Sequence, residues 1–209
     1  MPTLKQIARE HVQRPREDQL LPMPVPEVSG GLTNLYTWRS IERFVVAQTE
    51  RDGRKFFVVK MNLRDPETGH IDPEDLSYHL LVEPRPASQY TAGVPPSELY
   101  EDVGEVSLLL NGYYHTANIY HVQLVSEFQG KGLGTFMYKT TINDLVSSGW
   151  KVRSDTVRSP QATRVWFNLQ QRNPGTVRVI PRANRETVFE ANGIVHRRPN
   201  VKRHQRRSR

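Results

Sequence analysis

The alternation of apolar and polar positions predicts a β-hairpin in the first half of the chain. Residues 43–49 and 55–61 are rich in valine and phenylalanine, as β-strands are. Asp52 and Gly53 stand between the two runs, and glycine tolerates the positive φ of a tight turn. Residues 64–102 are rich in proline and acidic side chains instead, so we expect a loop with a little helix there.

The second half of the chain predicts a regular succession of strands and helices. Strand-like runs at 105–110 and 117–125 flank an Asn-Gly turn signal, which implies antiparallel pairing. Apolar positions then recur at helical spacing up to about Val146. A second helix is expected from Ser159 and Pro160 onward, because serine is a good N-cap and proline suits the first helical position. Two short strands complete the succession, at 151–155 and 176–180.

The two ends of the chain do not follow this pattern. We therefore expect the chain to have three parts. Residues 1–30 combine apolar positions at helical spacing with a proline-rich stretch, so we expect a short helix at 3–13 followed by an extended segment. Residues 31–195 form the expected folded domain. Residues 196–209 hold seven of the 29 Lys and Arg residues and no acidic residue, which leaves 22 basic against 22 acidic residues elsewhere. The net charge of +7 therefore belongs to this tail, which we expect to be disordered and able to bind nucleic acid non-specifically through its charge.

Composition excludes several classes of site. The chain has no cysteine, so it forms no disulfide, thiolate zinc site or cysteine nucleophile. The seven histidines show no ligand spacing, and we expect no metal. No apolar run approaches the roughly 18 residues of a membrane span, and no signal-peptide pattern begins the chain. We therefore expect a cytoplasmic protein without a membrane partner.

A glycine-rich turn between a predicted strand and a predicted helix is the sharpest chemical signal. The segment from Val125 to Gly134 contains three glycines at positions 130, 132 and 134. Glycines let backbone N–H groups approach a ligand, and a helix N-terminus adds partial positive charge, so this turn suits a phosphate or pyrophosphate. Lys131 can add a further positive charge.

Three phosphate-binding patterns compete for this turn. The P-loop spacing does not occur in it. The dinucleotide pattern is met at Gly130 and Gly132 but has Thr135 at its third glycine, and the antiparallel pairing expected before it argues against a βαβ unit, although Asp155 stands where a ribose ligand would. The third pattern, Gln/Arg-x-x-Gly-x-Gly/Ala, is matched by Gln129, Gly132 and Gly134.

This third pattern resembles that of the GNAT (N-acetyltransferase) superfamily. The preceding Leu-Val-Ser-Glu-Phe is similar to the family's approach to the motif, with Ser126 where proline is common. The order of elements over 103–181 also resembles the family's order, and the run from Ser154 to Trp166 is similar to GNAT-like proteins encoded by bacteriophages. The resemblance implies an α/β (α+β) fold with a mixed, mostly antiparallel central sheet flanked by helices. For a phage-encoded protein it implies the host cytoplasm or the virion as the location.

The resemblance implies acetyl-CoA as co-substrate and an amine, on a small molecule or a protein, as acceptor. The backbone of the strand before the motif would pair with the pantetheine arm, and the amides of the turn would hold the pyrophosphate. The implied cofactor-binding residues are Leu124, Val125, Gln129, Gly130, Lys131, Gly132, Leu133, Gly134 and Thr135.

The catalytic residues are open at this point. Glu105 and His121 lie on the two predicted strands and are candidates for the base that deprotonates the amine. Many family members use a tyrosine of the second helix to protonate the leaving thiolate, but Trp166 stands at that position here. Tyr120 is a candidate replacement. The alternative hypothesis is therefore a catalytically inactive GNAT-like protein, such as a phage structural or host-interaction protein with a nucleic-acid-binding tail.

Overall fold

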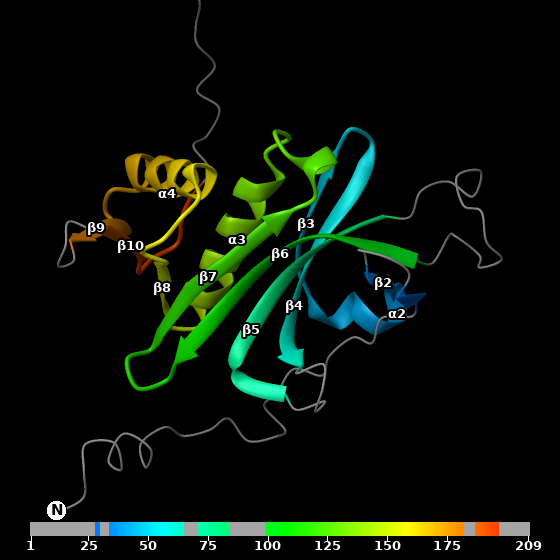
Figure 1. Cartoon of the computed structure of the whole chain (residues 1–209), viewed down its shortest axis with the longest axis horizontal. Coiled ribbons are helices and arrows are strands. Elements are labelled where there is room, and N and C mark those ends of the chain that lie inside the picture. Colours follow the sequence, from blue (N-terminus) through cyan, green and yellow to red (C-terminus); the bar gives the residue numbers. More distant parts are fainter. Residues whose placement is uncertain (1–27, 30–33, 65–70, 84–98, 182–186, 197–209) are drawn as a thin grey trace, which may run out of the picture.

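The computed structural model describes residues 28–29, 34–64, 71–83, 99–181 and 187–196, and shows one mixed sheet with helices on its faces (Figure 1). The path of the sheet is β3-β4-β5-β6-β7-β8-β10-β9, and β2 pairs with both β1 and β6. Every pairing is antiparallel except that of β7 with β8. The strands are β1 (Val28–Ser29), β2 (Asn34–Thr37), β3 (Val45–Arg51), β4 (Arg54–Arg64), β5 (Ile71–Val82), β6 (Leu99–Asn111), β7 (Thr116–Leu124), β8 (Lys151–Ser154), β9 (Val177–Pro181) and β10 (Thr187–Ala191). The expected fold class, a mixed and mostly antiparallel sheet flanked by helices, is confirmed.

The helices are short apart from two. They are α2 (Trp38–Ile41), η2 (Glu42–Phe44), η5 (Ser126–Phe128), α3 (Leu133–Ser147) and α4 (Pro160–Arg172). The predicted start of α4 is confirmed, since the Ser159 hydroxyl accepts a hydrogen bond from the Ala162 amide at 3.1 Å. Gly149 follows the C-terminal end of α3 and has a left-handed conformation (φ 85°). A helix often ends with such a residue, and glycine adopts this conformation at the lowest energetic cost.

The predicted hairpin is confirmed as β3 and β4. Asp52 (φ 52°) and Gly53 (φ 72°) form its turn, with the positive φ at both central positions that suits the twist of a two-residue hairpin. The succession predicted for the second half of the chain is confirmed as well, from β6 through β9. The last strand, β10, was not predicted.

The expectation of a loop with a little helix over 64–102 is wrong at 71–82, where β5 lies, and from 99 onward, where β6 begins; 65–70 and 84–98 lie outside the described residues. Leu76, Tyr78 and Leu80 alternate along β5 with Ser77 and His79. The apolar set is buried in the larger core, while Ser77 and His79 point to the other face, where they bond to polar partners. The strand therefore has an apolar and a polar face, and its polar residues together with the neighbouring acids and prolines resembled a loop in composition.

Two apolar clusters hold opposite faces of the sheet. The larger one joins β4–β8 to α3 and α4, and includes Met137, Ile142 and Trp166. The smaller one packs α2 and η2 against alternate residues of β4, such as Phe57 and Val59. Because side chains alternate across a strand, Phe56 and Val58 of the larger cluster point to the other face. The rest of that sheet face, formed by β5, β6 and β7 and here called the open face, is not covered by the described residues of the smaller cluster. It carries polar side chains such as His79 and Ser107.

Several expectations fall outside the described residues. These are the helix at 3–13, the proline-rich segment after it, and the basic tail from residue 197 onward. Among the described residues, no helix has the length and apolar character that crossing a membrane would need.

Candidate functional site

The glycine-rich turn is anchored to the core at one end and open at the other. Phe128 is 3% exposed and packs edge-on against Phe56, with 5.7 Å between the ring centroids. The Gln129 side-chain amide donates to the Leu124 carbonyl at 2.8 Å and so closes the turn back onto β7. Gly130 (φ 77°) and Gly132 (φ 78°) then adopt left-handed conformations that other residues adopt at a cost. The turn therefore has the left-handed backbone conformation that its glycines predict.

The N-terminal end of α3 presents backbone donors that have no acceptor within the helix. Gly132 is its N-cap, and the Phe136 amide donates to the Gly132 carbonyl at 3.0 Å. The amides of Leu133, Gly134 and Thr135 precede this bond and have no acceptor within the helix. A Cβ added at Gly130, Gly132 or Gly134 would meet no atom within 4 Å, so the space above the turn is open. Such a helix end suits an anion.

Lys131 lies at this turn but is bound to the tip of the β3–β4 hairpin. Its Nζ is 2.9 Å from Asp52 Oδ2, and both side chains are exposed. An exposed ion pair of this kind contributes about 0–1 kcal/mol to stability. The lysine can therefore exchange Asp52 for an anionic ligand at little cost.

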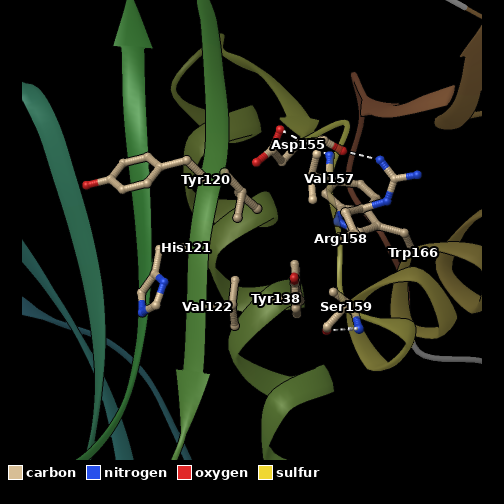
Figure 2. Close-up of a pocket in the computed structure, with 11 residues that line it drawn as sticks. Tyr120, His121, Val122, Tyr138, Asp155, Val157, Arg158, Ser159 and Trp166 are labelled. Atoms are coloured by element: carbon tan, nitrogen blue, oxygen red, sulfur yellow. Dashed lines mark hydrogen bonds between the residues drawn. The ribbon is translucent and has the colours of Figure 1, made fainter. Parts of the chain in front are cut away.

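The sheet opens beside this turn. β7 and β8 pair in parallel only from Thr116 to Ile119, and no strand of the described chain pairs with that edge of β7 farther on. A bulge at Tyr120 lies at the point where they diverge, because Ser107 pairs with His121 and Leu108 with Ile119. The opening holds a pocket of about 160 Å³ (Figure 2).

The free edge of β7 carries backbone groups that face away from β6. The Val125 N–H donates to the Val103 carbonyl at 2.9 Å, so that residue's amide is already paired. Hydrogen bonding alternates along an antiparallel strand, so the amide of Leu124 and both backbone groups of Val122 face the free edge. The Leu124 carbonyl accepts from Gln129. An extended ligand on this edge would thus meet Val122 and the Leu124 N–H.

Two residues of the pocket lining each contain a buried donor atom without a hydrogen-bond partner. Among the described residues, four buried side-chain atoms have no hydrogen-bond partner, and two of them are Arg158 Nε and Trp166 Nε1. Trp166 is fully buried, stacks on Phe189 and meets the edge of Tyr138. Burial raises the pKa of Tyr138 to about 12 although Arg158 lowers it, so its hydroxyl stays protonated. Leaving a buried donor unpaired costs about 1–3 kcal/mol.

The predicted catalytic residues gather on the open face. The Ser107 hydroxyl donates to the Glu105 carboxylate, and a hydrogen bond joins the Ser107 and Tyr120 hydroxyls. Burial and, next, the Asp75 carboxylate raise the pKa of Tyr120 above its ordinary 10.0. Tyr120 and His121 extend to the side of β7 away from Tyr138 and Trp166 (Figure 2). The structure thus brings Glu105 and Tyr120 together, with His121 exposed next to them.

A buried histidine continues this polar group and was not predicted. His79 Nδ1 lies 2.6 Å from Asp102 Oδ2, and Nε2 lies 2.8 Å from the Ser77 hydroxyl. His79 also pairs directly across the sheet with Glu105. Burial by itself lowers the pKa of His79, but the Asp102 and Glu105 carboxylates raise it to a net value above the ordinary 6.5. Ser77 is fully buried, so this serine cannot act as a nucleophile on an external substrate.

The alternation of polar and apolar residues over 75–80 is the signal that could have found His79. Its partner Asp102 lies 23 residues further on, so only the sheet register brings the two together. Among the described residues, no group of three His, Asp or Glu side chains is placed to hold a metal ion.

Comparisons with known proteins give likeness in shape only. No family model matches the sequence. No curated protein matches it either. The chain is similar to the solved structure of PaiA N-acetyltransferase from Thermoplasma acidophilum with coenzyme A, with 13% identity over 56% of this chain and 60% of that chain and a TM-score of 0.36. It is similar as well to IAA acetyltransferase from Bacillus cereus, with 17% identity over 64% of this chain and 97% of that chain and a TM-score of 0.37. A third similar structure is a variant of the cAMP-binding acyltransferase from Mycobacterium smegmatis, with 12% identity over 69% of this chain and 46% of that chain and a TM-score of 0.39. The solved structures that this chain resembles are thus N-acetyltransferases and acyltransferases, with likenesses too low to carry an argument about its own activity.

Proposed function

We propose that this protein is an acyl-CoA-dependent N-acetyltransferase that uses acetyl-CoA and an amine acceptor. One observation carries the proposal: the glycine-rich turn at the N-terminus of α3 directly follows β7, whose edge next to β8 is paired with no described strand beyond Ile119. The strand edge at which an extended ligand could bind is therefore followed along the chain by a site suited to an anion. A ligand with a pyrophosphate at one end and an amide-containing extended arm fits both.

The residues present fit such a ligand. The amides of Leu133, Gly134 and Thr135 would hold the pyrophosphate, with Lys131 beside them. The Val122 backbone and the Leu124 N–H would pair with the arm. The open space above Gly130, Gly132 and Gly134 leaves room for the phosphates.

The open face would bind the amine acceptor and provide the base that deprotonates it. Glu105 is held by Ser107 at the Tyr120 bulge, where the acyl carbon would lie within reach of both faces. In this proposal Glu105 takes one proton from the ammonium group of the substrate, and the resulting neutral amine attacks the thioester carbonyl carbon. The C–S bond breaks with its electron pair going to sulfur, and the nitrogen passes its second proton to water. A positioned base of this kind contributes typically about 10²–10⁴-fold to the rate. Tyr120, whose pKa is raised, stays a donor that orients the Glu105–Ser107 pair.

Calorimetric titration with acetyl-CoA tests the binding half of the proposal. We expect the parent to bind and Gly132→Glu to fail, because the added carboxylate would occupy the anion site. Gly149→Glu is the matched control: Gly149 also has positive φ (85°) and an open Cβ position, but it lies at the other end of α3. Absence of binding by the parent, or equal losses in the two variants, would refute the proposal.

Turnover is tested separately with a panel of amines and a thiol-release assay. We expect Glu105→Gln to lower kcat by about 10²-fold or more while leaving the affinity for acetyl-CoA unchanged. His121→Gln, an exposed neighbour on the same face, is the comparison that decides between the two predicted bases. If Glu105→Gln keeps full activity, Glu105 is not the base.

A second candidate function is binding without turnover, and Trp166 favours it. An indole N–H is too weak an acid to protonate a leaving thiolate, so a chain with tryptophan there lacks that usual acid. This candidate includes the phage structural or host-interaction protein. Acetyl-CoA binding without thiol release across the amine panel would support it.

The basic tail is proposed as a non-specific nucleic-acid tether in either case. Removing 197–209 deletes seven Lys and Arg residues but spares His196, whose amide donates to Asn173 Oδ1 at 2.9 Å. We expect the full chain to bind DNA with a log–log salt slope of about −6 and the truncated chain to lose that binding. Retention of salt-sensitive DNA binding after truncation would place the nucleic-acid surface on the folded domain.

A further inference from the structure

We propose that His79 is a positioning residue for the base Glu105: held as an imidazolium within the open face, it keeps the Glu105 carboxylate ionised and ready to accept a proton. This inference rests on the proposed function and assigns a buried group for which that function had no role. His79 itself neither gives nor takes a proton in the reaction, because its charge acts through Glu105.

The first line of evidence is that both ring nitrogens of His79 face hydrogen-bond acceptors. His79 is only 8% exposed, so its ring depends on protein partners. Nδ1 lies 2.6 Å from Asp102 Oδ2, and a carboxylate can only accept. Nε2 lies 2.8 Å from the Ser77 hydroxyl, which donates its own proton to the Met61 carbonyl at 3.5 Å and so accepts from Nε2. Both nitrogens are therefore donors, which is the pattern of an imidazolium.

The second line of evidence is the place of this imidazolium in the sheet. His79 of β5 and Glu105 of β6 are direct partners across the antiparallel pair. Side chains at such positions extend to the same face, with Cβ atoms about 4.5–5.5 Å apart. On its other side His79 pairs with Val59 of β4, which carries no charge. Burial lowers the pKa of His79, but the Asp102 and Glu105 carboxylates, both from β6, raise it to a net value above 6.5.

The third line of evidence is the negative charge of the open face. Its carboxyl groups include those of Asp75, Asp102 and Glu105. Burial and, next, the Asp72 carboxylate raise the pKa of Asp75, so negative charge already has a cost on this face. Like charges that share a site disfavour ionisation, and the imidazolium opposes this effect at Glu105. The Ser107 hydroxyl holds the same carboxylate by donating to Oε1, so two different neighbours set the charge and the orientation of the base.

Loss of the imidazolium should therefore matter in acid and not in alkali. Without the positive charge of His79, protonation of the base would set in at a higher pH, and the acid limb of the kcat/KM profile would move upward. A move of about one pH unit is a tenfold loss of kcat/KM at the acid end. At alkaline pH the base is ionised in either case, so the difference would vanish there.

The first test is the profile of kcat/KM from pH 5 to 9, with the amine of the panel that the parent acetylates fastest. We expect His79→Gln to fall about tenfold below the parent at the acid end and to lie within about twofold of it at pH 9. His196→Gln is the matched control, because it removes an exposed imidazole next to the C-terminal end of α4 and should follow the parent throughout. The calorimetric affinity for acetyl-CoA should be equal in the parent and His79→Gln at each pH, which excludes partial unfolding as the cause.

The second test is an NMR titration of the His79 ring, which needs neither turnover nor a variant of His79. Coupling between two charges is reciprocal, so Glu105 must favour the protonated ring as much as the ring favours the Glu105 carboxylate. We expect Glu105→Gln to lower the proton affinity of His79 at least about threefold. Glu74→Gln is the matched control, because it removes an exposed carboxylate of the same strand and should leave the titration unchanged.

Each outcome decides one point. Absence of turnover by the parent across the amine panel refutes the proposed function and this role with it. If the parent turns over and the ratio of kcat/KM between His79→Gln and the parent is the same at every pH, this inference is overturned and the proposed function stands. An unchanged titration of His79 in Glu105→Gln also overturns it. Should His79→Gln fail to fold, that titration decides by itself.

Discussion

A methyl group added at Gly104 would press on β7, the strand whose other edge the candidate site uses. Gly104 of β6 packs under α3, and a Cβ there would lie 2.9 Å from Leu124 Cδ1, 3.1 Å from the Gln123 carbonyl oxygen and 3.2 Å from Met137 Sδ. The two side-chain ends can move aside, but the carbonyl belongs to β7 and can move only with the strand. Overpacking of this kind costs about 1–3 kcal/mol. A chain of this size loses roughly 2–4 °C in Tm per kcal/mol, so Gly104→Ala should melt about 2–12 °C below the parent.

Chemical denaturation with a double-mutant cycle measures this effect. Leu124→Ala removes the nearest contact, so the double variant should show favourable coupling of at least about 0.5 kcal/mol. Gly112→Ala is the control on the same strand pair, since a Cβ there meets nothing within 4 Å, and it should leave the free energy of unfolding within about 0.5 kcal/mol. If Gly104→Ala is as stable as the parent, or if the coupling is zero, then Gly104 is not needed for the close approach of β6 and β7.

Two further predictions concern buried charges. Glu190 is fully buried and bonded to Arg153 (2.7 Å) and Arg178 (2.6 Å), so Glu190→Gln should cost about 1.5–3 kcal/mol at neutral pH in urea denaturation. Although burial raises the Glu190 pKa, the two arginines lower it to a net value below 4.5, so the deficit should shrink as the pH falls through that lowered value; a constant deficit would refute the ionic account. His79 has a raised pKa beside Asp102, so its ionic contribution is complete below pH 6.5 and is lost as the pH rises through its folded pKa. The deficit of His79→Gln should accordingly be larger at pH 5.5 than at pH 9, and the reverse order would contradict the pairing.

The candidate site was predictable from sequence where it depends on local backbone conformation. Gly130 and Gly132 both have positive φ, so the glycine spacing alone indicated a turn of this shape. The Ser159 cap is likewise a local contact between neighbouring residues. Such features follow from a few adjacent positions, and a single sequence contains all the information that they need.

The parts that were missed depend on register and on packing between distant segments. β5 was not predicted because its polar face and the prolines and acidic residues around it gave the segment the composition of a loop, although its apolar residues alternate as in a strand. His79 meets Asp102 only through the pairing of β5 with β6. The unpaired state of Trp166 Nε1 follows from how its ring packs between Phe189 and Tyr138, and no pattern in the sequence encodes the absence of a partner.

The position of β7 between the pocket and the open face has a kinetic consequence. Tyr120 and His121 lie on one side of the strand, and Tyr138 and Trp166 lie on the other (Figure 2). In the proposed reaction, an acyl donor in the pocket and an amine acceptor on the open face would approach from opposite sides of this strand and would not compete for the same space. Both would be bound before transfer, and a chain without cysteine offers no cysteine thiol to carry the acyl group in between. Initial-rate plots at varied concentrations of both substrates should therefore intersect rather than run parallel.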